Sequence, residues 1–131
     1  MGIWDGYVLP VMDARRSQVY TALFRAEGGQ LVREREDRAI SLEELEKDIK
    51  NLEKPIFLIG DGALLCYNTL VKEVPQLVMP PTHRTHQRAS GVALVAQDLV
   101  TAGDEGRAEE LVTNYLRLSQ AERERLAREN R

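Results

Sequence analysis

The chain has 131 residues, of which 43% are hydrophobic and 30% are charged, and its formal net charge is −3. This composition is ordinary for a globular domain, and the length is sufficient to bury a core. The acidic balance excludes general affinity for nucleic acid, because phosphate binding needs a basic face. No apolar stretch is long enough to cross a bilayer, and no signal peptide opens the chain. The single Cys66 cannot form an internal disulfide, so we expect a buried structural thiol in a cytoplasmic protein.

Two apolar runs near the N-terminus predict a β-hairpin. Residues 7–12 are almost wholly apolar, and residues 18–25 form the second run after a short charged turn. The pair Gly28-Gly29 predicts a further tight turn, because glycine readily adopts the positive φ values that such turns need. The next strand, residues 30–37, is strongly charged, which protects an exposed sheet edge from pairing. We therefore expect three antiparallel strands.

The middle of the chain alternates helices with strands. Ser41 and Glu44 have the spacing of a capping box at the start of an amphipathic helix. Residues 56–59 form a continuous apolar run between proline and glycine, which predicts a buried parallel strand. A second helix is expected over residues 63–73, and a short strand over residues 77–79.

The C-terminal third begins with a polar segment, residues 82–88, which we expect to be a loop leading into a third helix. Alanine and glycine keep that helix slim, so its backbone should lie close against a sheet or another helix. Ser119 and Glu122 form a second capping box, which predicts a final charged helix. We accordingly divide the chain into a lobe, residues 1–118, and a charged helix or frayed tail, residues 119–131.

The expected order of elements is three antiparallel strands, then helix, strand, helix, strand and helix. Local hairpins come first, and two crossover units then add parallel strands to the same sheet. This α/β order, with a mixed five-stranded sheet and a helical C-terminal tail, is that of the ribonuclease H-like fold, the lobe repeated in actin-like ATPases. A fold alone does not assign a function.

Two aspartates are the clearest candidates for chemistry. If the first and fourth strands are parallel neighbours, Asp13 and Asp61 lie at one sheet edge, where ligands of open α/β sheets bind. Two carboxylates could hold Mg²⁺ for a nuclease or phosphotransferase, with Glu44 as the only further acidic candidate on a helix. Alternatively, Asp13 orders its turn and Asp61 caps the following helix, because aspartate is preferred at both positions. We favour the structural alternative and nominate no catalytic residue and no metal ligand.

Two further motifs point only weakly to a ligand. Gly60-Asp61-Gly62 leads from a strand into a helix, so its amides could cradle a phosphate, at most as a vestigial nucleotide site. A full dinucleotide or Walker pattern is missing. His83 and His86 are three residues apart, but no cysteine or carboxylate cluster accompanies them, so we expect a solvated loop and no zinc. We therefore expect no cofactor.

Four motifs in the same order resemble those of the bacterial TsaB (YeaZ) family. Residues 11–20, VMDARRSQVY, look like its D-A-R-R-x-x-V-Y stretch. Residues 59–63, 88–93 and 115–117 agree with later stretches of the family, so the resemblance spans most of the chain. It marks several residues as a family signature or as partner contacts: Asp13, Arg15, Arg16, Tyr20, Tyr115 and Arg117.

That family resembles the actin-like ATPases and has two ribonuclease H-like lobes. The resemblance implies a non-catalytic scaffold that supports transfer of a threonylcarbamoyl group to adenosine 37 of tRNA by the catalytic homologue TsaD, together with the ATPase TsaE. Direct contact with tRNA is not expected.

The opening lobe of that family, with its I-D-T-S-like strand and glycine-rich stretch, has no counterpart in this sequence. We therefore interpret the chain as the second lobe alone. The family contacts TsaD largely through helices of the first lobe, so the isolated lobe should not capture TsaD. Its bare apolar face should instead favour a homodimer. The alternatives are the metal-dependent enzyme that uses Asp13 and Asp61, and an interaction module unrelated to tRNA modification.

Overall fold

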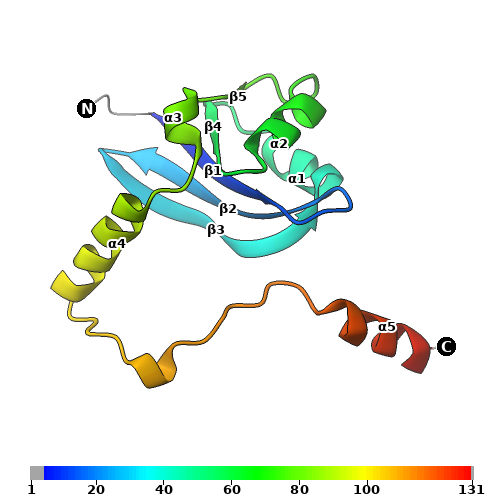
Figure 1. Ribbon diagram of the computed structural model, residues 1–131. Helices are drawn as coiled ribbons and strands as arrows, with labels where there is room; N and C mark the ends of the chain where they lie inside the picture. The colour runs from blue at the N-terminus through cyan, green and yellow to red at the C-terminus, as the bar shows by residue number, and fades with distance from the viewer. Residues whose placement is uncertain (1–4, 131) are drawn as a thin grey trace.

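The computed structural model describes residues 5–130, which contain a five-stranded sheet (Figure 1). The strands are β1 (Gly6–Asp13), β2 (Gln18–Glu27), β3 (Gln30–Ser41), β4 (Ile56–Ile59) and β5 (Leu77–Val78). They lie in the order β3-β2-β1-β4-β5, and β1 pairs antiparallel with β2 and parallel with β4. The mixed sheet predicted from the sequence is confirmed, with hairpins at one edge and crossover strands at the other.

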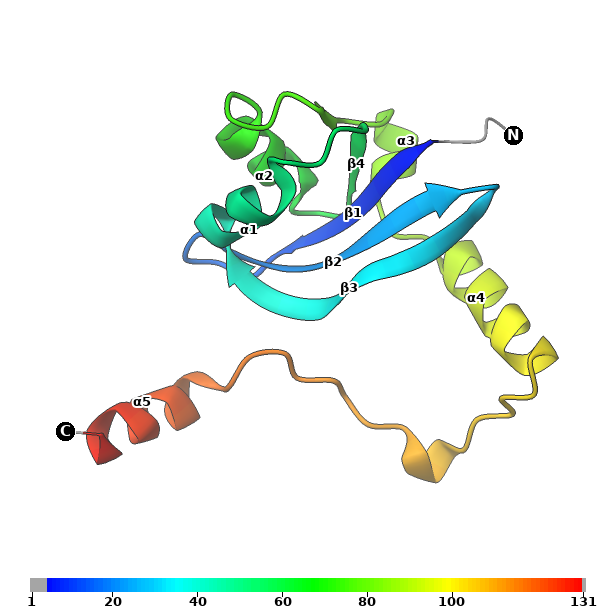
Figure 2. The ribbon, with the colours of Figure 1, turned by 180° about the vertical axis from the view of Figure 1, so that it is seen from behind.

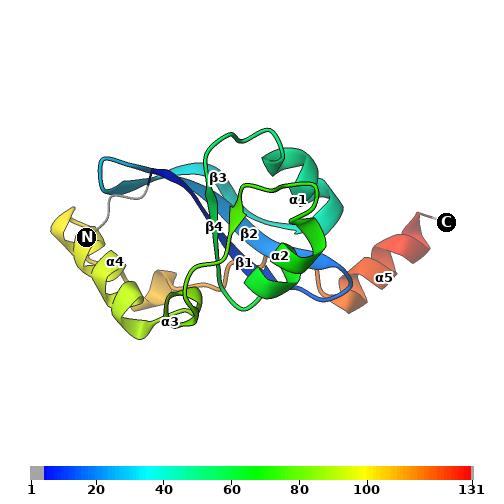
Figure 3. The ribbon, with the colours of Figure 1, turned by 90° about the horizontal axis from the view of Figure 1, so that it is seen from above.

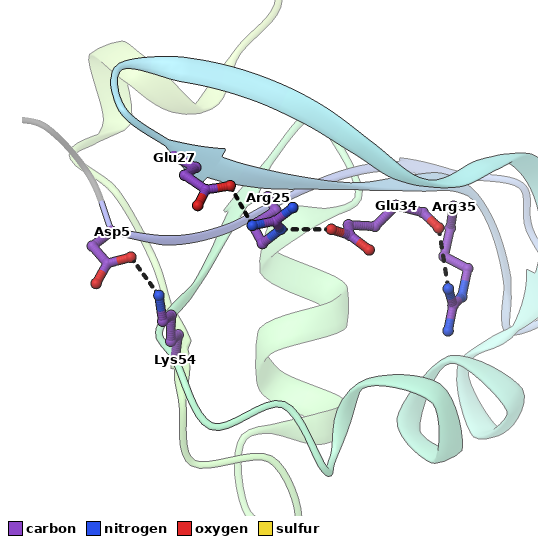
Figure 4. Close-up of polar contacts among 6 residues, drawn as sticks. All are labelled: Asp5, Arg25, Glu27, Glu34, Arg35 and Lys54. Atoms are coloured by element: carbon purple, nitrogen blue, oxygen red, sulfur yellow. Dashed lines mark hydrogen bonds and ion pairs between the residues drawn. The ribbon is translucent and has the colours of Figure 1, made fainter.

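The charged strand β3 forms one edge of the sheet, as predicted. Arg25 of β2 donates from Nε to Glu34 Oε1 at 2.6 Å and also pairs with Glu27 (Figure 4). Lys54 Nζ lies 2.7 Å from Asp5 Oδ1 in the same region. Exposed ion pairs add little stability, but they keep this edge polar and so oppose pairing with another molecule. The strand continues to Ser41, beyond its predicted end, because its last residues still pair with the start of β2.

The helices are α1 (Leu42–Ile49), α2 (Ala63–Leu70), α3 (Thr82–Thr85), α4 (Ala89–Thr101) and α5 (Gln120–Glu129), with a 3₁₀ turn, η1, at Ala108–Glu110. None of the helices within residues 5–130 combines the length and the apolar character needed to span a membrane. The one-turn helix α3 lies where we expected a loop. It forms because Arg84 N donates to Pro81 O at 2.8 Å, while the Thr85 hydroxyl donates to the same carbonyl at 3.3 Å.

Both predicted capping boxes are present. Ser41 Oγ accepts from Glu44 N at 3.1 Å, and Ser119 Oγ accepts from Glu122 N at 3.2 Å. Each glutamate in turn accepts from the amide and the hydroxyl of its serine. These bonds favour the charged carboxylate. The Ser41 amide and then its hydroxyl lower the pKa of Glu44, and the Ser119 hydroxyl and then its amide lower the pKa of Glu122.

The core lies between one face of the sheet and the helices α1 and α2 (Figure 2). Alternate residues of the strands point to this face, as the two-residue period of a β-strand requires. Cys66 of α2 is buried there, and burial raises the pKa of its thiol to about 12, so the expected structural thiol is confirmed. The core residues are Leu9, Val11, Val19, Leu23, Leu42, Leu45, Ile49, Ile56, Leu58, Ala63, Cys66, Leu70, Val74 and Leu77.

The other face of the sheet, which we call the second face, is apolar and only partly covered. Val8, Phe24 and Ile59 are half-buried there, and Met12 is 53% exposed. Helix α4 and the segment leading to α5 lie on this side of the sheet but stand away from it (Figures 1 and 3). No residue of α4 is buried, so our expectation that it packs closely was wrong. The extended backbone before α4, up to Arg88 at φ −128° and ψ 138°, carries the helix off the sheet.

Candidate functional site

The turn between β1 and β2 has an unusual backbone. Arg15, Arg16 and Ser17 have φ values of 61°, 53° and 57°, so three successive non-glycine residues are left-handed. Such residues cost about 1–3 kcal/mol each, and they persist only where the surroundings hold them in place. The β1–β2 turn is therefore the first place to look for a functional site.

Hydrogen bonds from within the turn and from α1 hold this conformation. Arg15 N donates to Asp13 Oδ1 at 2.7 Å, so the Asp13 carboxylate orders the turn. Gln18 N donates to Arg15 O at 3.0 Å and closes it. Leu42 N, at the start of α1, donates to Ser17 O at 3.0 Å. The turn is thus fixed to the helix that covers the core.

Asp61 reaches the same turn from the connection between β4 and α2. Its Oδ1 accepts from Asp13 N at 3.2 Å, so the two aspartates meet at the carboxyl ends of β1 and β4, as the parallel pairing predicts. The contact joins a carboxylate to an amide, and each Oδ1 accepts from backbone. Within residues 5–130, no group of three or more histidine, cysteine or acidic side chains is placed to hold a metal ion. The geometry accounts for both aspartates as acceptors that fix the turn.

The glycines beside Asp61 allow a close approach of two backbones. A Cβ at Gly60, where φ is 99°, would lie 2.3 Å from Val11 O. Gly60 N donates to Thr85 O at 2.6 Å, and Gly62 N donates to Val11 O at 3.0 Å. These two amides are therefore engaged within the chain. A phosphate site at Gly60-Asp61-Gly62 stays a prediction, and it would have to use other donors.

Arg117 connects the C-terminal segment to the turn. Its Nη1 donates to Ala14 O and to Gln18 Oε1, both at 2.9 Å, across 103 and 99 residues of sequence. The motif at residues 115–117 singled out Arg117, but sequence reasoning missed Gln18. No local pattern relates residues so far apart, so the signal was absent. Tyr115, by contrast, is 83% exposed.

The remaining predicted residues lie around this turn or away from it. Arg15 and Arg16 expose their side chains to solvent. Arg16 also borders a shallow hollow of about 230 Å³, which it shares with Arg123 of α5. Tyr20 lies half-buried on β2, opposite Met12. The structure thus gathers Asp13, Arg15, Arg16 and Arg117 at one end of the sheet, with Asp61 beneath them.

A larger groove of about 1150 Å³ lies at the other end of the second face, between the sheet and α4. Of the described residues that line it, only Arg84 and Arg88 carry a full charge, and His86 also borders it. His83 belongs to α3, so neither histidine is in the turn. The apolar lining comes from Val8, Ala26, Leu31 and Ile59 on the sheet side and Val92, Val95, Ala96 and Leu99 on α4.

The sheet and its two covering helices define a mixed α/β domain of the ribonuclease H-like, actin-like class. No family model matches the chain. The Bacillus subtilis (strain 168) tRNA threonylcarbamoyladenosine biosynthesis protein TsaB is 28% identical over 121 residues, covering 91% of this chain and 51% of that protein.

Two solved Pseudomonas aeruginosa structures share the fold. One is a protein with similarity to peptidase YeaZ, with a TM-score of 0.57, 18% identity and coverage of 86% of this chain and 50% of that one. The other is YeaZ, with a TM-score of 0.55, 16% identity and coverage of 85% and 50%. The chain is therefore a member of the TsaB (YeaZ) family, and it spans about half the length of the relatives that it matches.

Proposed function

We propose that the chain is the second lobe of a TsaB-type scaffold and takes part in forming threonylcarbamoyladenosine in tRNA without catalysing a step itself. The observation that carries this proposal is the similarity over 121 residues to the Bacillus subtilis protein of that pathway. A TsaD-type subunit would transfer the threonylcarbamoyl group, with a TsaE-type ATPase in support. The chain would act in the cytoplasm and leave tRNA binding to its partners.

The geometry of the β1–β2 turn supports a scaffold role. Asp13, Asp61 and Arg117 all form hydrogen bonds that hold the turn itself. Arg15 and Arg16 are left exposed on a braced backbone. A guanidinium group binds carboxylates and phosphates through several donors in a fixed plane, so a braced pair of arginines suits an acidic partner surface.

Capture of TsaD tests the proposal. Bacillus subtilis TsaD would be immobilised and presented with Bacillus subtilis TsaB, with this chain, and with this chain fused behind the first half of that TsaB. We expect capture of TsaB and of the fusion but not of the chain alone, because the family resemblance places the TsaD contact largely in the first lobe. The fusion should also support tRNA modification when TsaD and TsaE are added.

Two outcomes would contradict this assignment. Capture of the isolated chain as strongly as full-length TsaB would show that the lobe is not incomplete. A fusion that captures TsaD but supports no modification would remove the scaffold role. Arg15→Ala with Arg16→Ala in the fusion should weaken function and leave the folded content unchanged, whereas Lys72→Ala with Arg125→Ala, which removes charges elsewhere, should leave function intact.

A metal-dependent nuclease or phosphotransferase is the second candidate, and the meeting of Asp13 with Asp61 is the observation that favours it. Calorimetric titration with Mg²⁺ separates the two functions. The scaffold predicts no saturable binding, and it predicts normal folding of Asp13→Asn and Asp61→Asn, because asparagine keeps the acceptor oxygen that the backbone uses. Saturable binding that either variant abolishes would favour the enzyme.

A further inference from the structure

Helix α4 is apolar around its whole circumference. At 100° per residue, Val92, Val95 and Leu99 fall on the side that lines the groove, while Leu94 and Val100 fall on the opposite side. Leu94 is 63% exposed and Val100 is 61% exposed. A helix that is apolar on all sides belongs in an interior, and an isolated 13-residue helix is marginal in water. Closure of α4 onto its own sheet would cover only one of these two sides.

The groove beside α4 is suited to a polypeptide segment. Its volume of about 1150 Å³ exceeds the roughly 300–1000 Å³ of typical small-molecule sites, and one wall is the apolar second face of the sheet. Gly91 and Ala96 are among the residues of α4 that line it, and their small side chains permit a second helix to approach closely. The occupant should therefore be a helix with two apolar sides.

We propose that the occupant is α4 of a second copy of this chain. In a two-fold arrangement each α4 enters the groove of the other copy, so the layers are sheet, helix, helix and sheet. The groove-lining sides of the two helices then face each other. Leu94 and Val100 of each helix contact the second face of the partner's sheet, and every apolar side of α4 is covered.

The charges match this arrangement. The charged groove-lining residues Arg84 and Arg88 are both basic, and Asp98 is the only charged residue within α4. Arg88 and Asp98 are ten residues apart, about 15 Å along a helix. When two antiparallel helices cross with their midpoints at Ala93, each Arg88 lies at the level of Asp98 in the other copy. The two-fold axis produces this pair twice.

Mixing of charge-reversed variants tests the proposal. Sedimentation equilibrium of the full chain should give the mass of a dimer. Arg88→Asp alone and Asp98→Arg alone each place like charges together twice, so each should raise the dissociation constant by about tenfold or more. An equimolar mixture of the two variants should restore the dimer, because both contacts then join opposite charges. The inference does not depend on the proposed function.

A second pair of variants controls for general stickiness of the exposed apolar residues. Val95→Asp should give a folded monomer, whereas Leu111→Asp should remain dimeric, because Leu111 is 85% exposed but does not line the groove. The proposal is overturned by a monomeric wild-type chain at high concentration. It is also overturned if the mixed charge variants fail to associate, or if Val95→Asp and Leu111→Asp behave alike. A dimer whose single charge variants associate as tightly as wild type would place the interface elsewhere.

Discussion

The sheet-forming part of the chain and its C-terminal part contain the same local signals but differ in what those signals achieve. Ser41 with Glu44 and Ser119 with Glu122 cap α1 and α5 in the same way, at nearly the same distances. Helix α1 buries Leu42, Leu45 and Ile49 against the sheet, whereas α4, η1 and α5 bury no residue. Local sequence is thus sufficient to start and end a helix, but only a complementary surface gives it a place.

The sharpest test of this contrast compares two glycines with almost the same backbone angle. Gly60 has a φ of 99° and Gly103 has a φ of 97°. Alanine at Gly60 would push a Cβ to 2.3 Å from Val11 O, while nothing lies within 4 Å at Gly103. We expect Gly60→Ala to cost more than about 4 kcal/mol of unfolding free energy, and Gly103→Ala at most about 1–2 kcal/mol from its φ. Urea denaturation followed by circular dichroism measures both, and equal costs would contradict the close packing of β1 and β4.

A leucine in each region gives the next largest effect. Leu45 of α1 is fully buried, and Leu45→Ala should destabilise the chain by about 2–5 kcal/mol because it leaves a cavity in the core. Leu111→Ala, at a residue 85% exposed, should change the unfolding free energy by less than about 0.5 kcal/mol. The same denaturation experiment applies. A comparable loss in both variants would mean that the C-terminal segment shares the core.

Arg117 is the contact that joins the two regions. Arg117→Ala removes its hydrogen bonds to Ala14 and Gln18, and we expect a loss of roughly 1–2 kcal/mol. Hydrogen exchange should rise at residues 14–18, because the left-handed turn loses one of its supports. Arg107→Ala, which breaks an exposed pair with Glu110 at 3.7 Å, serves as the control and should change neither quantity. Unchanged exchange in the Arg117 variant would mean that the turn holds itself.

The two capping boxes give the smallest and most local effect. Ser41→Ala should lower the global unfolding free energy by about 1 kcal/mol, whereas Ser119→Ala should only reduce the helicity of α5. Acid should act in the same direction. The folded-state pKa values of Glu44 and Glu122 lie below the ordinary glutamate value, so the capping contribution is present above that value and disappears as the pH falls through the lowered pKa. A pH titration of helicity in the wild type and both variants measures this, and a helicity that is indifferent to acid would contradict the capping role.

The strands, both capping boxes and the meeting of Asp13 with Asp61 could be predicted because each depends on local pattern or on parallel pairing. The Gly28 and Gly29 turn was likewise predictable, with φ values of 59° and 81°. The contact of Arg117 with Gln18 could not be predicted, since it depends on where a distant segment returns to the sheet. The position of α4 failed for a related reason. Its composition favours close packing, but the extended backbone before it determines which surface it reaches.

Cys66 gives this chain an internal timer. A thiol whose pKa burial raises to about 12 is almost entirely protonated near neutral pH, and the thiolate is the form that reacts with alkylating agents. Since the sequence contains one cysteine, each alkylation event records one opening of the sheet and α2. The rate of labelling therefore reports how often the core opens in unmodified protein, without an added probe, and mass spectrometry can follow it in a mixture of partners.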